Sequence, residues 1–413
     1  MVARHGCHGK VGLPQTPRSR RVLVVCRQRT AAVVRAFAHA CRCAALDCHS
    51  LLVGHGAMIS GACRQVKELA EKLGAPVACT MLGLGAFPTD HELSLGMLGM
   101  HGTVYANKAV LDCDLIMSIG SRWDDRITGK LDVFCKDAVK LHIDIDPAEE
   151  GKVLQPDVFM CGDAKLVLEQ LLPMVNKLDT VDWLKTCQTW KKRFPLTYPK
   201  QGGLRMQHVI ATVSELTKGQ AIVTTDVGQH QMWVAQFFHI NNPRQLHSSG
   251  GAGTMGFGFP AAIGAAFGNT TGWPVVSFSG DGGFQMTEAE LATAAIHKLP
   301  IKIFVMDNKF LGMVRQWQDL FYDKRYSSVD MKGNPDFVKL AEAYGIPGLR
   351  IKRAADAQKM IQKALDYKDG PILIHCECEK EDNVYPMIPA GAPITAMMTE
   401  APKGKLEKPT GST

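Results

Sequence analysis

Residues 275–291 read VVSFSGDGGFQMTEAEL. An apolar, β-branched run ends at Gly280-Asp281-Gly282-Gly283, and a helix-like segment follows at once. A strand that passes through a glycine turn into a helix is the repeating unit of a parallel α/β sheet. Asp281 could be a turn residue, part of a phosphate-binding loop or a metal ligand, and only a partner elsewhere in the chain can decide between these roles.

The same alternation of strand and helix extends over most of the chain. It predicts an α/β fold with two doubly wound parallel sheets, which bind ligands at the carboxyl ends of their strands. One predicted helix carries its apolar face on Ala62, Val66, Leu69, Ala70 and Leu73. The predicted division is a basic leader (1–50), a central Rossmann-like domain (51–175), a linker (176–205), a second α/β domain (206–390) and a tail (391–413).

The positive charge of the chain is concentrated in the leader. The net charge is +7, but the first fifty residues hold nine Arg and Lys against a single acid, Asp47, so the rest is near neutral. This distribution argues against a nucleic-acid partner. The leader could be an organelle transit peptide or a nucleic-acid arm, but its low serine content favours an atypical, mis-framed or truncated segment without a function of its own.

The remaining composition is that of a globular intracellular protein. No apolar run reaches the roughly 18–20 residues that span a bilayer, so no membrane partner is expected. The 13 cysteines include no C-x-x-C pair, which favours reduced thiols over disulfides or zinc. We expect a cytoplasmic location, or a plastid or mitochondrion in a eukaryote.

One glycine pattern is a weak signal. Residues 251–256, GAGTMG, fit G-x-G-x-x-G, but the segment before them is a poor strand and the next acid, Asp281, lies thirty residues after Gly251. A dinucleotide loop needs a preceding strand and an acid about 20 residues further on. We therefore interpret the glycines as a place where the backbone comes close to a ligand, with a tightly packed helix following.

The partner that decides the role of Asp281 is Asn308. The two are separated by Gly282 and 25 further residues, and Asn308 stands at the end of the next apolar run, IKIFVMDN. Successive strand ends of a parallel sheet can lie side by side, and their carboxylate and carboxamide oxygens suit Mg²⁺ bound to a diphosphate. The pair therefore predicts a magnesium–diphosphate site.

This spacing resembles the thiamine-diphosphate (ThDP) motif of ThDP-dependent enzymes, and within them the catalytic subunit of acetohydroxyacid (acetolactate) synthase. The resemblance covers about residues 51–395. It is carried by the stretches 99–110, 120–129, 227–236, 248–265, 280–294, 307–327, 334–351 and 383–393.

The resemblance implies site residues and three cofactors, ThDP, Mg²⁺ and FAD. Asp281 and Asn308 would bind Mg²⁺ through their side chains and Phe310 through its backbone carbonyl, while Met313 and Trp317 would line the substrate channel. The implied ThDP contacts are Gly228, Gln229, His230, Gly253, Met255, Gly282, Gly283, Gly312, Met313 and Val314. The implied FAD contacts are Met100, His101, Gly102, Gly120, Arg122, Asp124, Arg126, Asp144, Asp163 and Ala164.

The implied reaction is the decarboxylation of pyruvate and transfer of the two-carbon unit to a second 2-oxo acid, in the synthesis of valine, leucine and isoleucine. FAD is largely structural in this family. The implied assembly is a homodimer or tetramer, with a possible regulatory small subunit. Two alternatives stay open: another ThDP enzyme of the pyruvate oxidase or glyoxylate carboligase type, and a non-catalytic cofactor-binding fragment.

One part of the family pattern is not found. Family members place a pyrimidine-binding domain before the FAD domain, and its Glu activates the cofactor. Here the FAD-like domain begins near residue 51, and residues 1–50 contain no Glu. No catalytic residue is therefore identified, and we expect the isolated chain to be inactive or severely impaired, to keep cofactor sites, and to expose an apolar surface.

Overall fold

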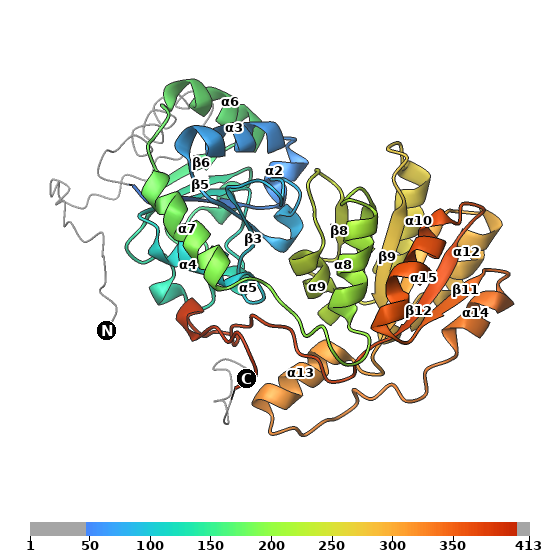
Figure 1. The fold of residues 1–413 in the computed structure, drawn as a ribbon. Helices are drawn as coiled ribbons and strands as arrows, with labels where there is room; N and C mark the ends of the chain where they lie inside the picture. The colour runs from blue at the N-terminus through green and yellow to red at the C-terminus, as the bar shows by residue number, and fades with distance from the viewer. Residues whose placement is uncertain (1–46, 403–413) are drawn as a thin grey trace.

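The computed structural model describes residues 47–402 and contains, over that range, two six-stranded sheets whose ladders are all parallel. Helices cover the faces of each sheet (Figure 1). The predicted fold class is confirmed. Residues 1–46 of the leader and residues 403–413 of the tail lie outside the described residues.

The first sheet has the strand order β3-β2-β1-β4-β5-β6, the order of dinucleotide-binding folds. It begins two residues before the expected boundary at 51. Its strands are β1 (His49–Val53), β2 (Val77–Cys79), β3 (Ser94–Met97), β4 (Leu115–Ile119), β5 (Val139–Asp144) and β6 (Val158–Cys161).

The helices of this domain pack apolar side chains onto the sheet. The five positions predicted for the apolar face of one helix, from Ala62 to Leu73, are all fully buried, and that helix ends at Gly74, whose left-handed conformation suits glycine. The helices are α2 (His55–Ile59), α3 (Cys63–Leu73), α4 (Val104–Asp112), α5 (Asp125–Thr128) and α6 (Ala164–Leu171).

The expected linker contains α7 (Val181–Arg193), which lies against the first domain. The indole of Trp183 donates to the carbonyl of His49 over 2.9 Å. The connection to the second domain is therefore anchored rather than freely extended.

The second sheet has the order β11-β12-β10-β9-β7-β8, and every residue of its central β10 is buried. Its strands are β7 (Ile222–Thr225), β8 (Leu246–Ser248), β9 (Val275–Gly280), β10 (Ile301–Asp307), β11 (Gly348–Ile351) and β12 (Ile372–Glu377). Its helices are α8 (Met206–Leu216), α9 (Gln229–Phe237), α10 (Gly258–Gly268), α11 (Asp281–Gln285), α12 (Leu291–Ile296), α13 (Gly312–Phe321), α14 (Phe337–Ala343) and α15 (Ala354–Asp366).

Short 3-10 turns complete the described chain. They are η1 (Met81–Gly83), η2 (Leu131–Val133), η3 (Pro147–Glu149), η4 (Leu172–Met174), η5 (Glu288–Glu290) and η6 (Ile394–Ala396). Across residues 47–402, no helix is both long enough and apolar enough to cross a membrane.

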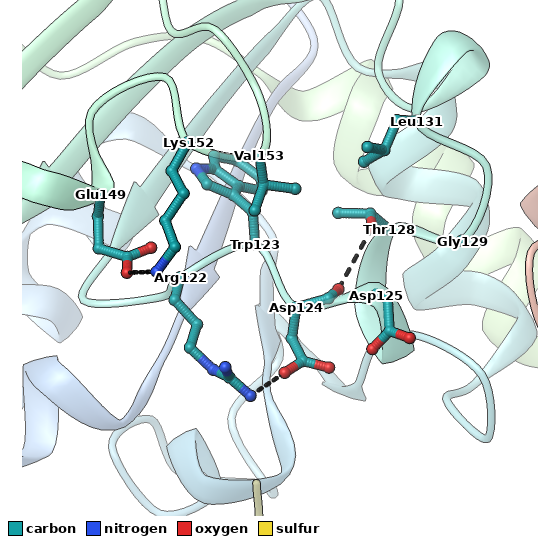
Figure 2. A pocket seen from close by; sticks show the side chains of 10 residues that line it. All are labelled: Arg122, Trp123, Asp124, Asp125, Thr128, Gly129, Leu131, Glu149, Lys152 and Val153. Atoms are coloured by element: carbon teal, nitrogen blue, oxygen red, sulfur yellow. Dashed lines mark hydrogen bonds and ion pairs between the residues drawn. The ribbon is translucent and has the colours of Figure 1, made fainter.

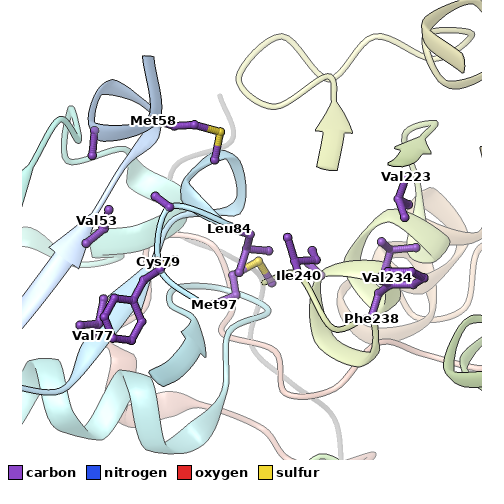
Figure 3. Close-up of a cluster of buried hydrophobic side chains, with 14 of the residues drawn as sticks. Val53, Met58, Val77, Cys79, Leu84, Met97, Val223, Val234, Phe238 and Ile240 are labelled. Carbon is purple, nitrogen blue, oxygen red and sulfur yellow. The ribbon is translucent and has the colours of Figure 1, made fainter. Parts of the chain in front are cut away.

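The two domains share one cluster of buried side chains. Leu84 and Met97 of the first domain and Phe238 and Ile240 of the second belong to it (Figure 3). At its edge, the Thr89 hydroxyl donates to the Ile240 carbonyl over 2.7 Å. The carboxyl edges of the two sheets are therefore held in a fixed relation.

The segment after β12 returns to the first domain (Figure 1). The amide of Ile388 donates to the Met100 carbonyl over 2.9 Å, and the amide of Lys130 donates to the Ala392 carbonyl over 3.1 Å. Ile394 is buried. The beginning of the predicted tail, as far as the structure describes it, therefore packs against the protein.

Candidate functional site

Asp281 and Asn308 lie at the same edge of the second sheet. Gly280 and Met306 are partners in the β9–β10 ladder, so the residues that follow them leave neighbouring strand ends. Both side chains are buried, with exposures of 2% and 3%. The prediction that these two strand ends meet is confirmed.

Among the described residues, the hydrogen-bond donors to the buried Asp281 carboxylate include no cationic group. Its oxygens accept from the amide of Gly282 over 3.0 Å and from Nδ2 of Asn334 over 2.7 Å. Burial raises the pKa of Asp281 to about 7; the Asn334 hydrogen bond opposes this rise and the neighbouring Asp307 adds to it. A bound cation would offset the cost of this buried charge.

The Asn308 amide has a fixed orientation. Its Nδ2 donates to Oε1 of Gln229 over 3.4 Å, and its Oδ1 accepts from the Phe310 amide over 3.2 Å. Phe310 forms an isolated bridge with Asp330, but the hydrogen bonds of that bridge use the Leu311 amide and the Lys309 carbonyl. The Phe310 carbonyl therefore takes no part in the bridge.

Among the residues that the structure describes, no group of three or more His, Cys, Asp or Glu is arranged to hold a metal ion. The predicted set is different in kind: one carboxylate, one carboxamide and one backbone carbonyl. Such a sparse oxygen set fits Mg²⁺, which usually keeps water and substrate phosphates among its ligands.

His230 lies beside this edge, near the start of α9. Burial lowers the pKa of His230 to about 4, although nearby Asp226 opposes the change. Its Nε2 is buried without a hydrogen-bond partner, and a Cβ atom on Gly228 or Gly280 would stand 3.0 Å from its ring. The two glycines therefore leave room for the imidazole, whose Nε2 is a buried polar atom that a bound ligand could satisfy.

Three further glycines are required by close contacts. A Cβ on Gly283 would lie 2.2 Å from the Asp226 carboxylate, and one on Gly312 would lie 2.2 Å from Oε1 of Gln229. A Cβ on Gly282 would meet Leu311 at 2.6 Å and the methyl group of Met255 at 3.8 Å. The structure therefore brings Met255 to the turn that carries Asp281.

The remaining predicted ThDP and substrate residues are more exposed. Gly253 is exposed in a left-handed conformation, with a φ of 65°. On α13, Val314 is half exposed, whereas Met313 and Trp317 are partly buried. Met313 and Trp317 stand four residues apart on this helix and so share one face.

Asp226 is a residue of the site that the sequence did not reveal. Its buried carboxylate accepts from the amides of Val227 (2.8 Å), Gly256 (3.1 Å) and Gly258 (3.0 Å). It therefore fixes the glycine loop 251–256 beside β7. A carboxylate two residues before Gly228 was the available signal, but its partners in the glycine loop and α10 lie 30 and 32 residues away.

Gln316 was also missed. It is fully buried, and its side chain joins Gln229 (2.9 Å) to both the amide (2.7 Å) and the carbonyl (3.2 Å) of Val384. These bonds hold α13 against α9 and against the returning C-terminal segment.

The segment before the glycine loop was predicted to be a poor strand. The segment before residues 251–256 does form a strand, β8, although it has three residues and pairs only with β7 at the edge of the sheet. The position of this loop is fixed by its hydrogen bonds to Asp226.

The predicted FAD residues follow the carboxyl ends of β3, β4, β5 and β6. Four of them line two separate cavities. Arg122 and Asp124 form an ion pair and line a cavity of about 270 Å³, with Trp123, Glu149 and Lys152 also in its wall (Figure 2). Met100 and Arg126 line a second gap of about 10 Å³.

Several of these residues have structural partners of their own. Asp163 caps α6 by accepting from the Leu166 amide over 3.1 Å, and a Cβ on Gly120 would lie 2.6 Å from Gly56. His101 is buried, its Nδ1 lies 3.2 Å from the Pro386 carbonyl, and burial lowers its pKa to about 4. Asp144, Gly102 and Ala164 stand along the same edge of the sheet.

The chain matches known proteins over both domains. The description "Thiamine pyrophosphate enzyme, central domain" matches residues 49–171, and "Thiamine pyrophosphate enzyme, C-terminal TPP binding domain" matches residues 226–376. The boundaries of the two matches fall close to the two sheets. The C-terminal match contains Asp281 and Asn308.

Relatives with curated names share nearly half of the aligned residues. The acetolactate synthase large subunit of Cyanidium caldarium is 45% identical over 84% of this chain and 60% of its own length. The chloroplastic acetolactate synthase of Arabidopsis thaliana is 44% identical over 85% of this chain and 54% of its own length. The acetolactate synthase of Mycobacterium bovis is 44% identical over 83% of this chain and 57% of its own length.

The chain spans between half and two thirds of the length of these relatives. The level of identity and the two domain matches nevertheless agree with the strand-end geometry. The chain belongs to the thiamine pyrophosphate enzyme family, as a homologue of the acetolactate synthase large subunit.

Proposed function

We propose that this chain carries the cofactor-binding domains of an acetolactate synthase. The reaction decarboxylates pyruvate and joins the two-carbon unit to a second 2-oxo acid, giving 2-acetolactate or 2-aceto-2-hydroxybutyrate for branched-chain amino-acid synthesis. The observation that carries the proposal is the pairing of buried Asp281 and Asn308 at neighbouring strand ends, within a chain 45% identical to a large subunit of that name.

The residues at the second sheet fit magnesium and a diphosphate. Asp281 would supply the single protein charge, while Asn308 and the Phe310 carbonyl would supply neutral oxygens. In the tautomer that carries its proton on Nε2, His230 can donate a hydrogen bond from this nitrogen to a diphosphate oxygen. Bound ThDP supplies an electron sink for the carbanion that remains after carbon dioxide leaves.

The proposed ThDP contacts have different roles. Gly282 and Gly283 would let the backbone come close to the diphosphate, since a Cβ at these positions would meet Leu311 or Asp226. Gln229 orients Asn308 through Nδ2. Gly253, Met255, Gly312, Met313 and Val314 would surround the rest of the cofactor.

We propose FAD as the ligand of the first sheet. The ends of β3 and β6 are separated by the whole six-stranded sheet, a width of about 24 Å at roughly 4.8 Å per strand. A ligand that contacts both Gly102 and Asp163 must therefore be extended, as a dinucleotide is. Arg122 would pair with its diphosphate, and Asp144 would accept hydrogen bonds from a ribose.

The substrate channel is proposed along α13. Met313 and Trp317 share a face of this helix, and the Trp317 ring packs on Phe321 with centroids 5.4 Å apart. Gln316, one residue earlier, holds the helix in place. The channel side chains therefore stand on a fixed support.

Cofactor binding by the full chain provides the first test. Isothermal titration with ThDP and Mg²⁺ should show binding that depends on both, and flavin fluorescence should show binding of FAD. If neither binds, the proposal fails, because both the catalytic interpretation and that of a cofactor-binding fragment require intact sites.

Product analysis provides the second test and separates the alternatives. Residues 47–402 would replace the matching segment of the Cyanidium caldarium large subunit. This chimera should form 2-acetolactate from pyruvate, and Trp317→Leu should change the ratio of products formed with two competing 2-oxo acids. Acetate or acetyl phosphate would indicate a pyruvate oxidase, and condensation restricted to glyoxylate would indicate a carboligase of that type. Light scattering of the chimera with and without a regulatory small subunit tests the proposed assembly.

A further inference from the structure

Two carboxylates, not one, lie at the proposed metal site. Asp281 follows β9 and Asp307 ends β10, and each is only 2% exposed. Buried like charges this close repel each other. Only Asp281 and Asn308 belong to the two-part pattern that predicts Mg²⁺, so the presence of Asp307 requires a structural explanation.

The side chain of Asn334 lies between the two carboxylates. Its Nδ2 donates to Oδ2 of Asp281 over 2.7 Å and to Oδ1 of Asp307 over 3.0 Å. Its Oδ1 accepts from Nε2 of Gln285 over 2.9 Å. Only the donor end of an amide can face two carboxylates, so the orientation of Asn334 is fixed by its partners.

Asn334 is itself held in place by the backbone. Its amide donates to the Met331 carbonyl over 3.1 Å, and the Met331 amide donates to the Lys309 carbonyl over 2.9 Å. The loop before α14 is thereby tied to the loop that follows β10. Asn334 is thus attached to the same piece of backbone that carries Asn308.

The row of contacts continues to a third strand. The second oxygen of Asp307 lies 2.9 Å from Nε2 of His375 on β12. His375, Asp307, Asn334 and Asp281 therefore form one hydrogen-bonded row, partly buried at Asn334 and buried elsewhere, across the ends of β12, β10 and β9, which are neighbours in the sheet. A row of this kind restricts each member to one rotamer.

We propose that Asn334 is a positioning residue for the divalent cation. It donates to both Asp281 and Asp307 and so holds the Asp281 carboxylate in one orientation, and the site does not have to be ordered when the cation arrives. The inference rests on the proposed Mg²⁺ site and adds to it a residue that lies outside the motif. Removing a partner that orients a metal ligand typically weakens metal binding by about 10- to 100-fold.

The experiment measures the dissociation constant of Mg²⁺ in the full chain by calorimetry, at a saturating concentration of ThDP. Asn334→Ala should weaken Mg²⁺ binding by about 10- to 100-fold. Asn269→Ala is the matched control, because Asn269 organises a loop of the same domain through the Trp273 carbonyl and should leave Mg²⁺ binding unchanged. The unfolding temperature without Mg²⁺ shows whether each variant is folded.

Gln285→Ala is a second variant, which keeps the proposal testable if Asn334→Ala does not fold. It frees the oxygen end of Asn334 and should weaken Mg²⁺ binding in the same direction by a smaller factor. Equal Mg²⁺ affinity in the wild type and a folded Asn334→Ala would overturn the proposal. So would tighter binding by the variant, because the amide would then compete with the cation for the Asp281 oxygen. A wild type that binds no Mg²⁺ would instead overturn the proposed metal site, and this inference with it.

Discussion

The carboxyl edges of the two sheets differ in how they hold charge. At the second sheet, the polar side chains of Asp281, Asp307 and Asn308 are buried, and their hydrogen-bond partners include the side chains of Asn334, His375 and Gln229. At the first sheet, Arg122 and Arg126 are each 61% exposed and pair with Asp124 and Asp125, their neighbours in the sequence.

The difference indicates two ways of building a cofactor site in one fold. Buried, mutually bonded groups are set before a ligand arrives, and their burial costs stability that a cation can offset. Exposed ion pairs contribute little to stability and can exchange partners with a ligand. We therefore expect substitutions at the second edge to affect both fold and binding, and substitutions at the first edge to affect binding alone.

The largest expected effect is that of Asp281→Ala. Loss of the only charged ligand should weaken Mg²⁺-dependent ThDP binding by more than about 100-fold, since even orienting partners of a ligand are worth 10- to 100-fold. Without cofactors the variant should unfold at the same or a higher temperature, because a buried carboxylate is removed. Asp356→Ala, which removes an exposed carboxylate of α15, is the control for calorimetry and thermal unfolding. ThDP and Mg²⁺ affinities within twofold of wild type would show that the buried edge is not the cation site.

Gly283→Ala should have the next largest effect, because it should lower both the free energy of unfolding and the affinity for ThDP. The new methyl group would meet the Asp226 carboxylate, and overpacking of this kind costs about 1–3 kcal/mol. Displaced Asp226 would also release the amides of Gly256 and Gly258, so ThDP binding should weaken.

The matched control for Gly283→Ala is a glycine substitution that should stabilise the fold instead of destabilising it. Gly264 lies within α10 with nothing close to a new Cβ, so Gly264→Ala should stabilise the chain by about 0.5–1 kcal/mol. Urea unfolding of the two variants measures both values. Equal shifts in the two would show that the edge adapts to a methyl group and is not preformed.

Lys302 tests whether buried charge in the second domain is confined to the cofactor edge. It stands near the other end of β10, is 1% exposed, and donates to the Tyr367 carbonyl. Burial lowers the pKa of Lys302 to about 8, and nearby Lys368 adds to the change.

The lowered pKa of Lys302 determines how the stability of the protein should change with pH. The folded pKa lies below the unfolded value, so folding disfavours the protonated form, with the full penalty below about pH 8 and none above about pH 10.5. Lys302→Met should therefore be more stable than wild type at pH 7, by on the order of 2 kcal/mol. This advantage should shrink as the pH rises towards 10. An advantage independent of pH would show that Lys302 is held charged at no cost.

The sequence predicted most of the fold and one part of the second site. Apolar runs that end in glycine or aspartate identified the strands, and the distance from Gly282 to Asn308 placed two strand ends together. These features are local, or depend only on the order of strands in a parallel sheet. The edge strand β8 was missed because it is short and only partly buried.

Contacts between distant segments could not be predicted in the same way. Asn334 lies 53 residues after Asp281, in a loop whose path is set by a single bridge between Phe310 and Asp330. Asp226 and Gln316 meet their partners only because helices and loops pack at the sheet edge. The proposed FAD residues were identified by resemblance, and their roles remain predictions that binding experiments must test.

Arg122→Ala should have the smallest effect on stability, and it tests the exposed edge. Arg122 pairs with Asp124 in the wall of the 270 Å³ cavity. A charge-assisted hydrogen bond to a phosphate is worth about 1.5–3 kcal/mol, so FAD affinity measured by flavin fluorescence should fall by roughly 10-fold or more. The free energy of unfolding without FAD should change by less than about 0.5 kcal/mol, as for other surface substitutions. Arg353→Ala, which breaks an exposed pair with Asp356 far along the chain, should leave FAD affinity unchanged. A large loss of stability in Arg122→Ala would contradict the distinction between the two edges, because the first would then also be preformed.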